Sequence, residues 1–466
     1  MTPHPSAFAA VLVGGGPAGF AVLLNADKEG TLRTLLRRGL LMVERSAAPG
    51  RGTIGDYLIN SDSTGATFLH PLQHAREGAL RRILRTPVAK RIAQAGHGAV
   101  PLADVGELMA LIGQAFCTIV AAYPRSRIMT CCTAQFARRS AGGIWRIGVA
   151  DGNGRTEVFE AQQLVLATGA GQPAGRLASE CVAGVPVQER WGGRLVQSGD
   201  LLTQAGLEAA AKCLRGRRDP KVAILGGSTS AVAVAHALLH RADGVAFEEG
   251  AITLFHRKPL RVYYAGTAEA LADGYDEFGP DDVCPVSKRL YRFAGLRLDS
   301  RELLMQVRGL AGRAPEPRVV LHQLGRNDEA DIRGIDQADL VVAAFGYRPN
   351  ALPLFDESNC PIALLAETAP SAPLVDEECR VLQADGEPLP GVYGIGLAAG
   401  YRPRGKFGGE PSFLGQANGL WLWQNGIGGV IAQALLTSPA APEVRSIANS
   451  LTRARHAICF PAMEIA

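Results

Sequence analysis

In the stretch Ala9-Ala10-Val11-Leu12-Val13-Gly14-Gly15-Gly16-Pro17-Ala18-Gly19, a glycine-rich turn follows an apolar run. The apolar run predicts a buried strand, and the glycines predict a tight turn into a helix that extends toward Arg38. A second apolar stretch, Leu40 to Val43, ends in Glu44. This order of strand, turn, helix and strand predicts a βαβ unit with a parallel sheet and a right-handed crossover.

The glycines of this turn have the spacing of a dinucleotide-binding loop. Gly14 would form the tight turn, Gly16 would let the backbone approach a pyrophosphate, and Gly19 would let the helix pack on the strand. The pyrophosphate charge would then face the N-terminus of the helix. Glu44 is placed to accept hydrogen bonds from an adenosine ribose, while a tight turn without a ligand is the alternative. The predicted contacts of the dinucleotide are Gly14, Gly16, Pro17, Ala18, Gly19 and Glu44.

A second βαβ unit follows later in the chain. Its first strand is predicted at 221–225, and a turn over 226–230 leads into a helix that reaches about His240. The next strand is predicted at 251–255. Two such units predict two dinucleotide-binding folds in one chain.

The turn of the second unit is a degenerate version of the first. Ser228 stands where a glycine would let the backbone approach phosphate, although its hydroxyl could donate a hydrogen bond there. Arg257 and Lys258 follow the next strand in place of an acid, which suits the additional 2′-phosphate of NADP. A decayed site that binds nothing is the alternative. The predicted contacts of this second dinucleotide are Gly226, Ser228, Thr229, Ser230 and Arg257.

The two units are expected to form one domain inserted in another. The range 128–161 predicts a β-meander with a hairpin turn at 151–154, and further strands are predicted at 164–169, 340–345 and 392–396. Because strands that would complete the first sheet lie on both sides of the second unit, insertion explains the order better than repetition. The predicted ranges are 1–200 and 336–466 for the outer domain, and 215–335 for the inserted domain.

Composition limits the classes of protein that fit. The 466 residues are 47% hydrophobic and 20% charged, which suits about two to three folded domains and excludes a disordered chain. The net charge of +4 is too small to indicate nucleic acid, and the basic run 81–91 is interpreted as a solvated helix face rather than an anion site. No stretch has the ~20 apolar residues of a membrane span. We expect a cytoplasmic protein with no nucleic-acid or membrane partner.

No metal site is predicted. The nine cysteines lack the spacing of metal ligands and are expected to be reduced, buried thiols, with Cys131 and Cys132 in a strand. His236 and His240 have the spacing of a zinc pair, but no carboxylate lies between them. We interpret them as ordinary histidines of a helix face.

Four further stretches carry a resemblance to a known family. Leu166 to Gly169 and Ala343 to Pro349 look like paired "ATG" junctions at which the chain crosses between domains. Trp191 to Ser198 is similar to the signature F-x-G-x-x-x-H, with Trp191 for the Phe and Gln197 for the His. Residues 275–280 resemble an "NExFxP" motif. The chain thereby resembles the two-domain flavoproteins that include the flavin-containing, Baeyer–Villiger and amine N-hydroxylating monooxygenases.

The resemblance implies an α/β architecture and two cofactors. A Rossmann-like FAD-binding domain of three-layer ββα type would carry an inserted Rossmann-like domain for NADPH, with NADH left open. Thr168 and Gly169 at the first junction would contact cofactor, and Gln197 would position the nicotinamide as the candidate catalytic residue. Gly396 would contact FAD, although the family usually has Asp where Leu397 follows it. A helix expected after Gly415 would present its positive end to the flavin ring near Gln416 and residue 418.

The implied reaction is monooxygenation. NADPH would reduce FAD, and one atom of molecular oxygen would pass to a small nucleophilic substrate, with an amine favoured. The loop 400–415, which contains Arg402 and Arg404, would be a mobile cover over the flavin that suits an acidic substrate; a plain exposed loop is the alternative. An NAD(P)H:acceptor reductase or oxidase without oxygen insertion and a non-enzymatic flavin-binding protein with a decayed nicotinamide site stay open, as does a homo-oligomer.

Overall fold

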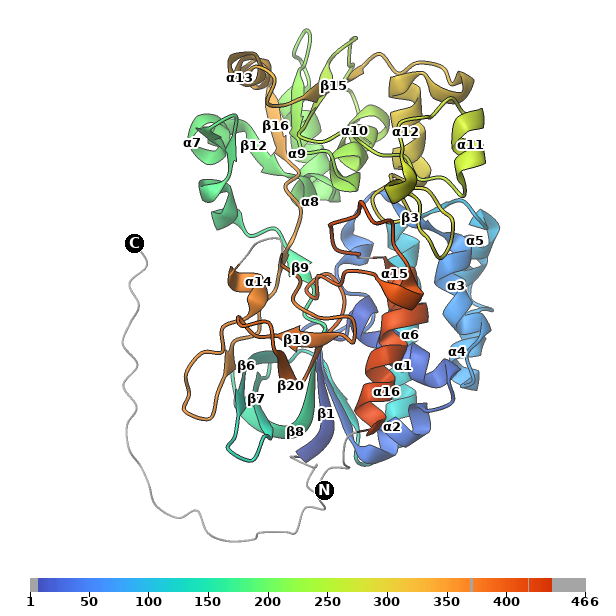
Figure 1. Ribbon diagram of the computed structural model, residues 1–466, viewed down its shortest axis with the longest axis vertical. Coiled ribbons are helices and arrows are strands. Elements are labelled where there is room, and N and C mark those ends of the chain that lie inside the picture. The colour runs from blue at the N-terminus through green and yellow to red at the C-terminus, as the bar shows by residue number, and fades with distance from the viewer. Residues whose placement is uncertain (1–6, 369–371, 418, 438–466) are drawn as a thin grey trace.

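The glycine-rich stretch lies between two parallel strands in the first of two lobes (Figure 1). Strands β1 (Ala7–Val13) and β2 (Leu40–Val43) are buried along nearly their whole length, as their apolar sequences predict. The single helix expected between them is instead two helices, α1 (Pro17–Lys28) and α2 (Leu32–Arg38), because the chain turns at Gly30 with a φ of +78°. This computed structural model describes residues 7–368, 372–417 and 419–437.

One long strand joins the two parts of the first sheet. Strand β8 (Thr156–Leu166) pairs antiparallel with β7 (Trp145–Ala150) in its first half and parallel with β1 in its second half. The strand expected at 164–169 is therefore the end of β8 and not a separate element. The hairpin turn predicted at 151–154 connects β7 to β8.

The β-meander is shorter than the predicted range 128–161. It begins at β6 (Thr133–Arg139), because β5 (Arg127–Met129) pairs parallel with β2 at the far edge of the sheet. The nine-stranded sheet has the order β18-β6-β7-β8-β1-β2-β5, and β20 also pairs with β8 and carries β19 beside it. The other strands of this lobe are β3 (Asn60–Thr64), β4 (Ala99–Pro101), β18 (Leu354–Phe355), β19 (Arg380–Leu382) and β20 (Pro388–Gly394).

Helices cover the parallel strands on the side away from the meander (Figure 1). Helix α1 packs against α16 (Gly428–Thr437), and buried Asn25 on α1 donates a hydrogen bond to the carbonyl oxygen of Trp423 at 3.1 Å. The meander, the sheet and the helices confirm the predicted three-layer ββα fold. The remaining helices are α3 (Gly65–Gln73), α4 (Gly78–Ile83), α5 (Pro87–Ala95), α6 (Leu102–Ala121), α14 (Leu365–Thr368) and α15 (Leu420–Leu422).

The second lobe contains a five-stranded parallel sheet with the order β12-β16-β13-β14-β15. Its strands are β12 (Leu195–Gln197), β13 (Val222–Leu225), β14 (Ile252–His256), β15 (Val319–Gln323) and β16 (Leu340–Ala343). Because β12 and β16 flank the predicted range 215–335, the second sheet extends beyond it at both ends. The domain limits themselves stay a prediction. The helices are α7 (Val187–Trp191), α8 (Ser198–Leu201), α9 (Gln204–Leu214), α10 (Thr229–Arg241), α11 (Thr267–Ala272), α12 (Leu298–Arg308) and α13 (Asp328–Asp336).

The chain passes between the lobes at the two predicted junctions. After β8, strand β9 (Ala170–Gly171) pairs antiparallel with β17 (Arg348–Pro349), which follows β16. Asn350 supports this pair, since its backbone N–H donates to the carbonyl of Gly169 at 2.9 Å and its side chain donates to the carbonyl of Thr168 at 3.0 Å. The two crossings therefore lie side by side between the lobes (Figure 1).

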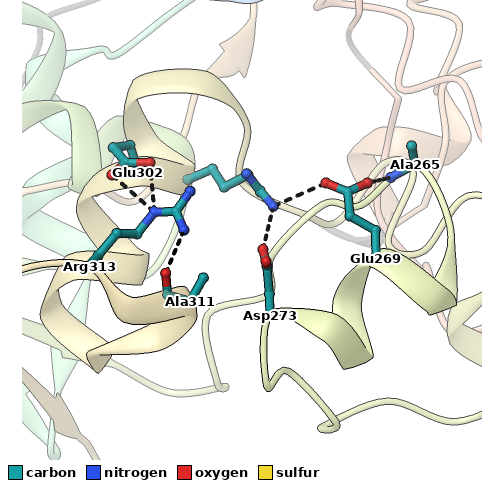
Figure 2. Close-up of polar contacts among 7 residues, drawn as sticks. Ala265, Glu269, Asp273, Glu302, Ala311 and Arg313 are labelled. Atoms are coloured by element: carbon teal, nitrogen blue, oxygen red, sulfur yellow. Dashed lines mark hydrogen bonds and ion pairs between the residues drawn. The ribbon is translucent and has the colours of Figure 1, made fainter.

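Ion pairs join α11 to α12 and α12 to the turn that follows it (Figure 2). Arg301 on α12 lies 3.4 Å from the carboxylate of Glu269 and 3.2 Å from that of Asp273. Arg313 donates to the carboxylate of Glu302 at 3.0 Å. These pairs are partly solvent-exposed, so we expect them to orient the helices while contributing at most about 1 kcal/mol each.

Helix α6 is long and apolar enough to cross a membrane by length and composition, contrary to the expectation that no stretch would be. Its buried face, which includes Val105 and Ile112, belongs to the core of the first lobe. The ring of Phe116 stacks on Phe20 of α1 at 5.3 Å. Since a core helix meets the same test, α6 is only weak support for a membrane span.

The cysteines differ from the prediction of uniformly buried thiols. All cysteines of the described residues are free, but four of them are exposed. Cys131 and Cys132 lie in the connection between β5 and β6 and not in a strand, and Cys131 has a φ of +55°. The exposed four are Cys131, Cys181, Cys213 and Cys360, and the buried ones are Cys132, Cys284 and Cys379.

Candidate functional site: two dinucleotide cradles

The first glycine turn is packed too closely for side chains. A Cβ atom at Gly14, whose φ is +107°, would lie 2.1 Å from the carbonyl oxygen of Ala167, and one at Gly19 would lie 2.0 Å from the carbonyl oxygen of Gly14. Gly16 is different, since the nearest atom to a Cβ there is the Cα of Gly52 at 3.9 Å. Gly14 and Gly19 are thus required because any side chain there would clash with the backbone. Gly16 instead leaves open space at the N-terminus of α1.

That open space can receive a phosphate. Gly16 is the N-cap of α1 and has no side chain to satisfy the first backbone N–H groups of the helix, which starts with Pro17 and Ala18. Unsatisfied N–H groups and the helix dipole favour an anion at this point. The described geometry therefore fits a pyrophosphate.

Glu44 holds the glycine turn in place. One of its carboxylate oxygens accepts a hydrogen bond from the backbone N–H of Gly15 at 2.7 Å, and the other accepts from Ser46 at 2.8 Å. The side chain is buried, so these bonds offset the cost of removing its charge from water. A role of Glu44 toward a ribose stays a prediction, and a carboxylate oxygen retains a second lone pair for it.

Gly396 brings the last strand to the same place. A Cβ at Gly396, whose φ is +89°, would lie 2.7 Å from the Cβ of Ala18 at the start of α1. Leu397 packs against the hydrophobic core instead of offering a carboxylate. Thr168 and Gly169 follow directly after Ala167, whose carbonyl contacts the turn. The structure thus brings these predicted residues together from three distant segments.

The helix predicted after Gly415 begins later than expected. Gln416 lies in a loop, and helix α15 starts only at Leu420. Gln416 lies close to Gly400, because a Cβ at Gly400 would be 2.7 Å from its side-chain nitrogen. Residue 418 lies outside the described residues.

The segment that crosses the glycine turn was missed by the sequence-based prediction. The backbone N–H of Gly50 donates to the carbonyl of Gly15 at 2.6 Å, and a Cβ at Gly52 would lie 3.1 Å from the Cδ of Pro17. The turn 14–19 thus forms one side of the predicted dinucleotide site, and these two glycines form the other side. We call this site the first cradle. The spacing of the two glycines soon after Glu44 is a signal that could have identified them.

The second glycine turn has a related geometry. A Cβ at Gly226 would lie 2.6 Å from the carbonyl oxygen of Ala344, so this glycine is required by packing. Ser228 is the N-cap of α10 but its hydroxyl makes no capping hydrogen bond, which leaves the N–H groups of Thr229 and Ser230 available to an anion. Arg257 is exposed directly after β14. The predicted contacts of the second dinucleotide thus gather at the carboxyl edge of the second sheet.

Gln197 lies at the end of β12, beside the connection between the lobes. Its side-chain amide donates to the carbonyl oxygen of Gln172 at 2.7 Å, and its side chain is mostly buried. Nearby, the hydroxyl groups of Tyr57 from the first lobe and Tyr347 from the connection lie 3.0 Å apart. Burial raises the pKa of Tyr347, so its hydroxyl stays protonated. The two tyrosines were not predicted, since nothing local in the sequence marks them.

The loop 400–415 is bound to the second lobe and is not a plain exposed loop. The buried carboxylate of Glu410 accepts hydrogen bonds from the backbone N–H groups of Phe293 at 2.9 Å and Ala294 at 2.8 Å. Arg292 donates to the carbonyl of Phe407 at 2.6 Å. Whether the loop moves stays a prediction.

A cavity of about 230 Å³ opens at this loop. Arg402, Arg404, Phe413 and, from the second lobe, Pro285 line it. Glu410 also lines the cavity, and its carboxylate is bound to the backbone N–H groups of Phe293 and Ala294. The two arginines suit a ligand with an anionic group.

Cys284 adds an ionised group to the same contact between the lobes. Its sulfur accepts hydrogen bonds from the backbone N–H groups of Ser287 at 3.4 Å and Gly409 at 3.3 Å, and from Arg292 at 3.6 Å. Burial raises the pKa of the thiol, but these hydrogen bonds outweigh burial and hold the pKa at about 6. The thiolate therefore helps to fasten the loop 400–415 to the second lobe.

Comparisons with known proteins agree with this arrangement. CMP-5′-(3-aminopropyl)phosphonate hydroxylase of Streptomyces rubellomurinus is 32% identical over 446 residues, which cover 94% of this chain and 99% of that protein. No family model matches the chain.

Solved structures share the fold. The cadaverine monooxygenase of Erwinia amylovora, solved with FAD, has a TM-score of 0.53 at 12% identity and covers 97% of this chain and 99% of its own. The ornithine hydroxylase of Pseudomonas aeruginosa has a TM-score of 0.52 at 13% identity, with 92% and 99% covered. The ornithine N-hydroxylase of Kutzneria has a TM-score of 0.51 at 14% identity, with 93% and 99% covered. At such identities these likenesses show the fold alone.

The fold and its two glycine-rich turns define a protein with two Rossmann-like dinucleotide-binding domains. The chain belongs to the family of CMP-5′-(3-aminopropyl)phosphonate hydroxylase, because the identity extends over nearly the whole of both chains.

A matched pair of glycine variants tests the FAD cradle. Gly396 and Gly386 share a φ of +89°, but nothing lies within 4 Å of a Cβ at Gly386. Gly396→Ala and Gly386→Ala therefore both place an alanine at the same positive φ, while only Gly396→Ala pushes a methyl group against Ala18 at the start of α1. We expect Gly396→Ala to purify with less than half of the wild-type flavin, measured by visible absorbance per protein, and Gly386→Ala to keep it. Equal flavin content in both variants would contradict this placement of FAD.

The Cys284 thiolate predicts a pH-dependent stability. An unfolded thiol ionises near pH 9, so the stabilisation from the lowered pKa is complete above pH 9 and is lost as the pH falls through about 6. Cys284→Ser removes the thiolate and keeps a hydrogen-bonding atom. We expect the loss in free energy of unfolding caused by Cys284→Ser, measured by urea denaturation, to be greater at pH 9 than at pH 6. Cys213→Ser, an exposed control, should show no such trend.

Proposed function

We propose that this protein hydroxylates the primary amine of a small substrate that carries a phosphonate or phosphate group. The observation that carries the proposal is the near full-length relationship to a hydroxylase named for a CMP-linked aminopropylphosphonate. The cavity lined by Arg402 and Arg404 supports it independently, because guanidinium groups match phosphonate and phosphate oxygens.

Each part of the chain has a task in this reaction. Bound FAD and NADPH supply two electrons and activate molecular oxygen, so that one oxygen atom enters the amine and the other leaves as water. The N-termini of α1 and α10 hold the two pyrophosphates. Gln197, fixed by the carbonyl of Gln172, orients the nicotinamide beside the connection between the lobes. The loop 400–415 excludes water and presents the cationic cavity to the substrate.

A panel of amines tests the proposed reaction. NADPH oxidation by the yellow, FAD-loaded protein should be accelerated by 3-aminopropylphosphonate or its CMP ester more than by ornithine, lysine or cadaverine. The hydroxylated amine should account for most of the NADPH consumed. Hydrogen peroxide in amounts equal to the NADPH, with no hydroxylated product, would instead establish the oxidase alternative. Flavin that NADPH never bleaches would favour a non-enzymatic protein.

Arg402 and Arg404 should control the affinity for the anionic end of the substrate. Loss of one charge-assisted hydrogen bond costs about 1.5–3 kcal/mol, or roughly tenfold to a hundredfold in affinity. We expect Arg402→Ala and Arg404→Ala each to raise KM for a phosphonate-bearing amine at least about tenfold, with a smaller change in kcat. KM for an amine without the anionic group should not change. Arg155→Ala, an exposed control in the β7–β8 hairpin, should behave as wild type; an unchanged KM in both cavity variants would contradict this role.

The cytoplasmic location, the absence of nucleic-acid and membrane partners and a homo-oligomeric state stay predictions.

A further inference from the structure

The two crossings form a short ribbon that is fastened at both of its ends. Strands β9 and β17 have two residues each and pair antiparallel between the lobes. Asn350 fastens the end toward the first lobe by its two hydrogen bonds to the other crossing. A two-stranded ribbon is only marginally stable by itself. The angle between the lobes therefore depends on the contacts that hold the ribbon at each end.

Gln172 fastens the end where β9 enters the second lobe. Three consecutive residues at the end of β12 bind it. Its side-chain oxygen accepts from the backbone N–H of Gly199 at 2.7 Å, its side-chain nitrogen donates to the hydroxyl of Ser198 at 3.0 Å, and its backbone carbonyl accepts from the side chain of Gln197. Ser198 is fully buried. The side-chain nitrogen of Gln172 also lies 3.5 Å from the carbonyl oxygen of Gly346, which belongs to the second crossing.

Arg176 holds the second crossing at the same end of the ribbon. Its terminal nitrogens donate to the carbonyl oxygens of Phe345 at 2.7 Å and Gly346 at 2.8 Å, and its Nε donates to Glu180 at 2.6 Å. The same carboxylate lies 3.9 Å from Arg348 of β17. The side chain of Arg176 is only 11% exposed. Its planar guanidinium group fixes these acceptors in one geometry.

The backbone that Gln172 holds lies against a direct contact between the lobes. A Cβ at Gly199 would lie 2.7 Å from Oε1 of Gln172 and 3.3 Å from the hydroxyl of Tyr347. That hydroxyl lies 3.0 Å from the hydroxyl of Tyr57 in the first lobe. A change at Gln172 would therefore reach the surface on which the two lobes meet.

We infer that Gln172 and Arg176, which we call the clamp, hold the second lobe at the angle that hydride transfer from NADPH to FAD requires. In this step the C–H bond at C4 of the nicotinamide breaks and an N–H bond forms at N5 of the flavin, so that NADPH is oxidised to NADP⁺ and FAD is reduced to FADH⁻. The clamp residues are positioning residues, because they act through the two crossings and the end of β12. The inference rests on the cofactors of the proposed function and goes beyond it by naming what sets the angle between their domains.

The rate of hydride transfer is sensitive to such an angle. Reacting atoms must lie about 3–3.5 Å apart, and a displacement of about 1 Å can cost roughly a hundredfold in rate. Because the clamp binds backbone and side-chain groups of the protein itself, its loss should leave the affinity for each cofactor nearly unchanged.

The distance between the lobes can be measured without NADPH or substrate. Spin labels on the exposed Cys213 of α9 and Cys360 of the first lobe report on it by pulsed electron paramagnetic resonance of the FAD-loaded full chain. The other cysteines that could react are replaced by serine in every sample: Cys117, Cys131, Cys181 and Cys459. We expect Gln172→Leu and Arg176→Met each to widen the distribution of distances. Distributions as narrow as that of the wild type in both variants would overturn the inference.

Arg190→Met is the matched control for the distance measurement. Arg190 of α7 lies in the same connection between the crossings and β12, but it binds the carboxylate of Asp336 instead. Its removal should leave the distribution as narrow as in the wild type. Gln172→Asn, which stays polar but is shorter, takes the place of Gln172→Leu if the latter purifies without FAD, with the same expected widening.

Anaerobic reduction of FAD by NADPH, followed by stopped-flow absorbance, tests whether the angle serves hydride transfer. We expect Gln172→Leu and Arg176→Met each to lower the limiting rate about tenfold to a hundredfold, with Kd for NADPH near its wild-type value. Gln172→Glu keeps the oxygen that accepts from Gly199, and Arg176→Lys keeps one donor, so both should restore part of the lost rate. An unchanged limiting rate in both clamp variants, or a loss that lies entirely in Kd, would overturn the inference.

The outcomes separate the clamp from the proposed reaction. Wild-type FAD that NADPH reduces without hydroxylation of any amine overturns the substrate proposal and leaves the clamp standing. Amine hydroxylation at the wild-type rate in both clamp variants overturns the clamp and leaves the proposed function standing. Wild-type FAD that NADPH never reduces overturns both.

Discussion

The close approach of the Gly14 turn to the carbonyl oxygen of Ala167 is the contact on which the first lobe depends. No side chain fits between these two backbones, so β1 and β8 can meet here only through glycine. The contact sets the start of α1 above the carboxyl edge of the sheet, and Glu44 ties the same turn to the end of β2. Gly396 then brings the last strand against Ala18. The ends of β1, β2 and β8 and the N-terminus of α1 therefore lie close together, and this arrangement forms the predicted dinucleotide site.

The relation between the lobes follows from a second set of contacts. The chain crosses twice through the paired strands β9 and β17, and the loop 400–415 returns from the first lobe to bond with the second through Glu410. Two cofactors in separate domains can exchange electrons only if the domains hold a defined orientation. The buried carboxylate and the Cys284 thiolate supply that orientation with groups whose removal leaves backbone N–H groups unsatisfied.

Sequence patterns located the strands well and the breaks between elements less well. The strand Leu40–Val43 was predicted with its observed bounds, since a fully buried strand is continuously apolar. The turn at Gly30 was missed, although a glycine after Asp27, Lys28 and Glu29 is a signal for the end of a helix. The start of helix α15 was placed at Gly415 instead of Leu420, since glycines at both 415 and 419 are possible N-caps and the sequence does not choose between them. The meander was extended to β5, because alternation of residues cannot show which partner a strand takes.

The amino-acid sequence by itself determined the two glycine turns, the acid after the first and the arginine after the second, while the two crossings were found through a resemblance to known flavoproteins. Each of these is a local pattern, and its backbone conformation allows few residue types. Only the tertiary structure decided that Gly52 walls the first cradle, that Tyr57 meets Tyr347, and that Arg176 binds the second crossing. These residues come together because of the order of the strands in the sheets and the paths of the loops. Such contacts join residues far apart in the chain, so no local or periodic pattern in the sequence predicts them.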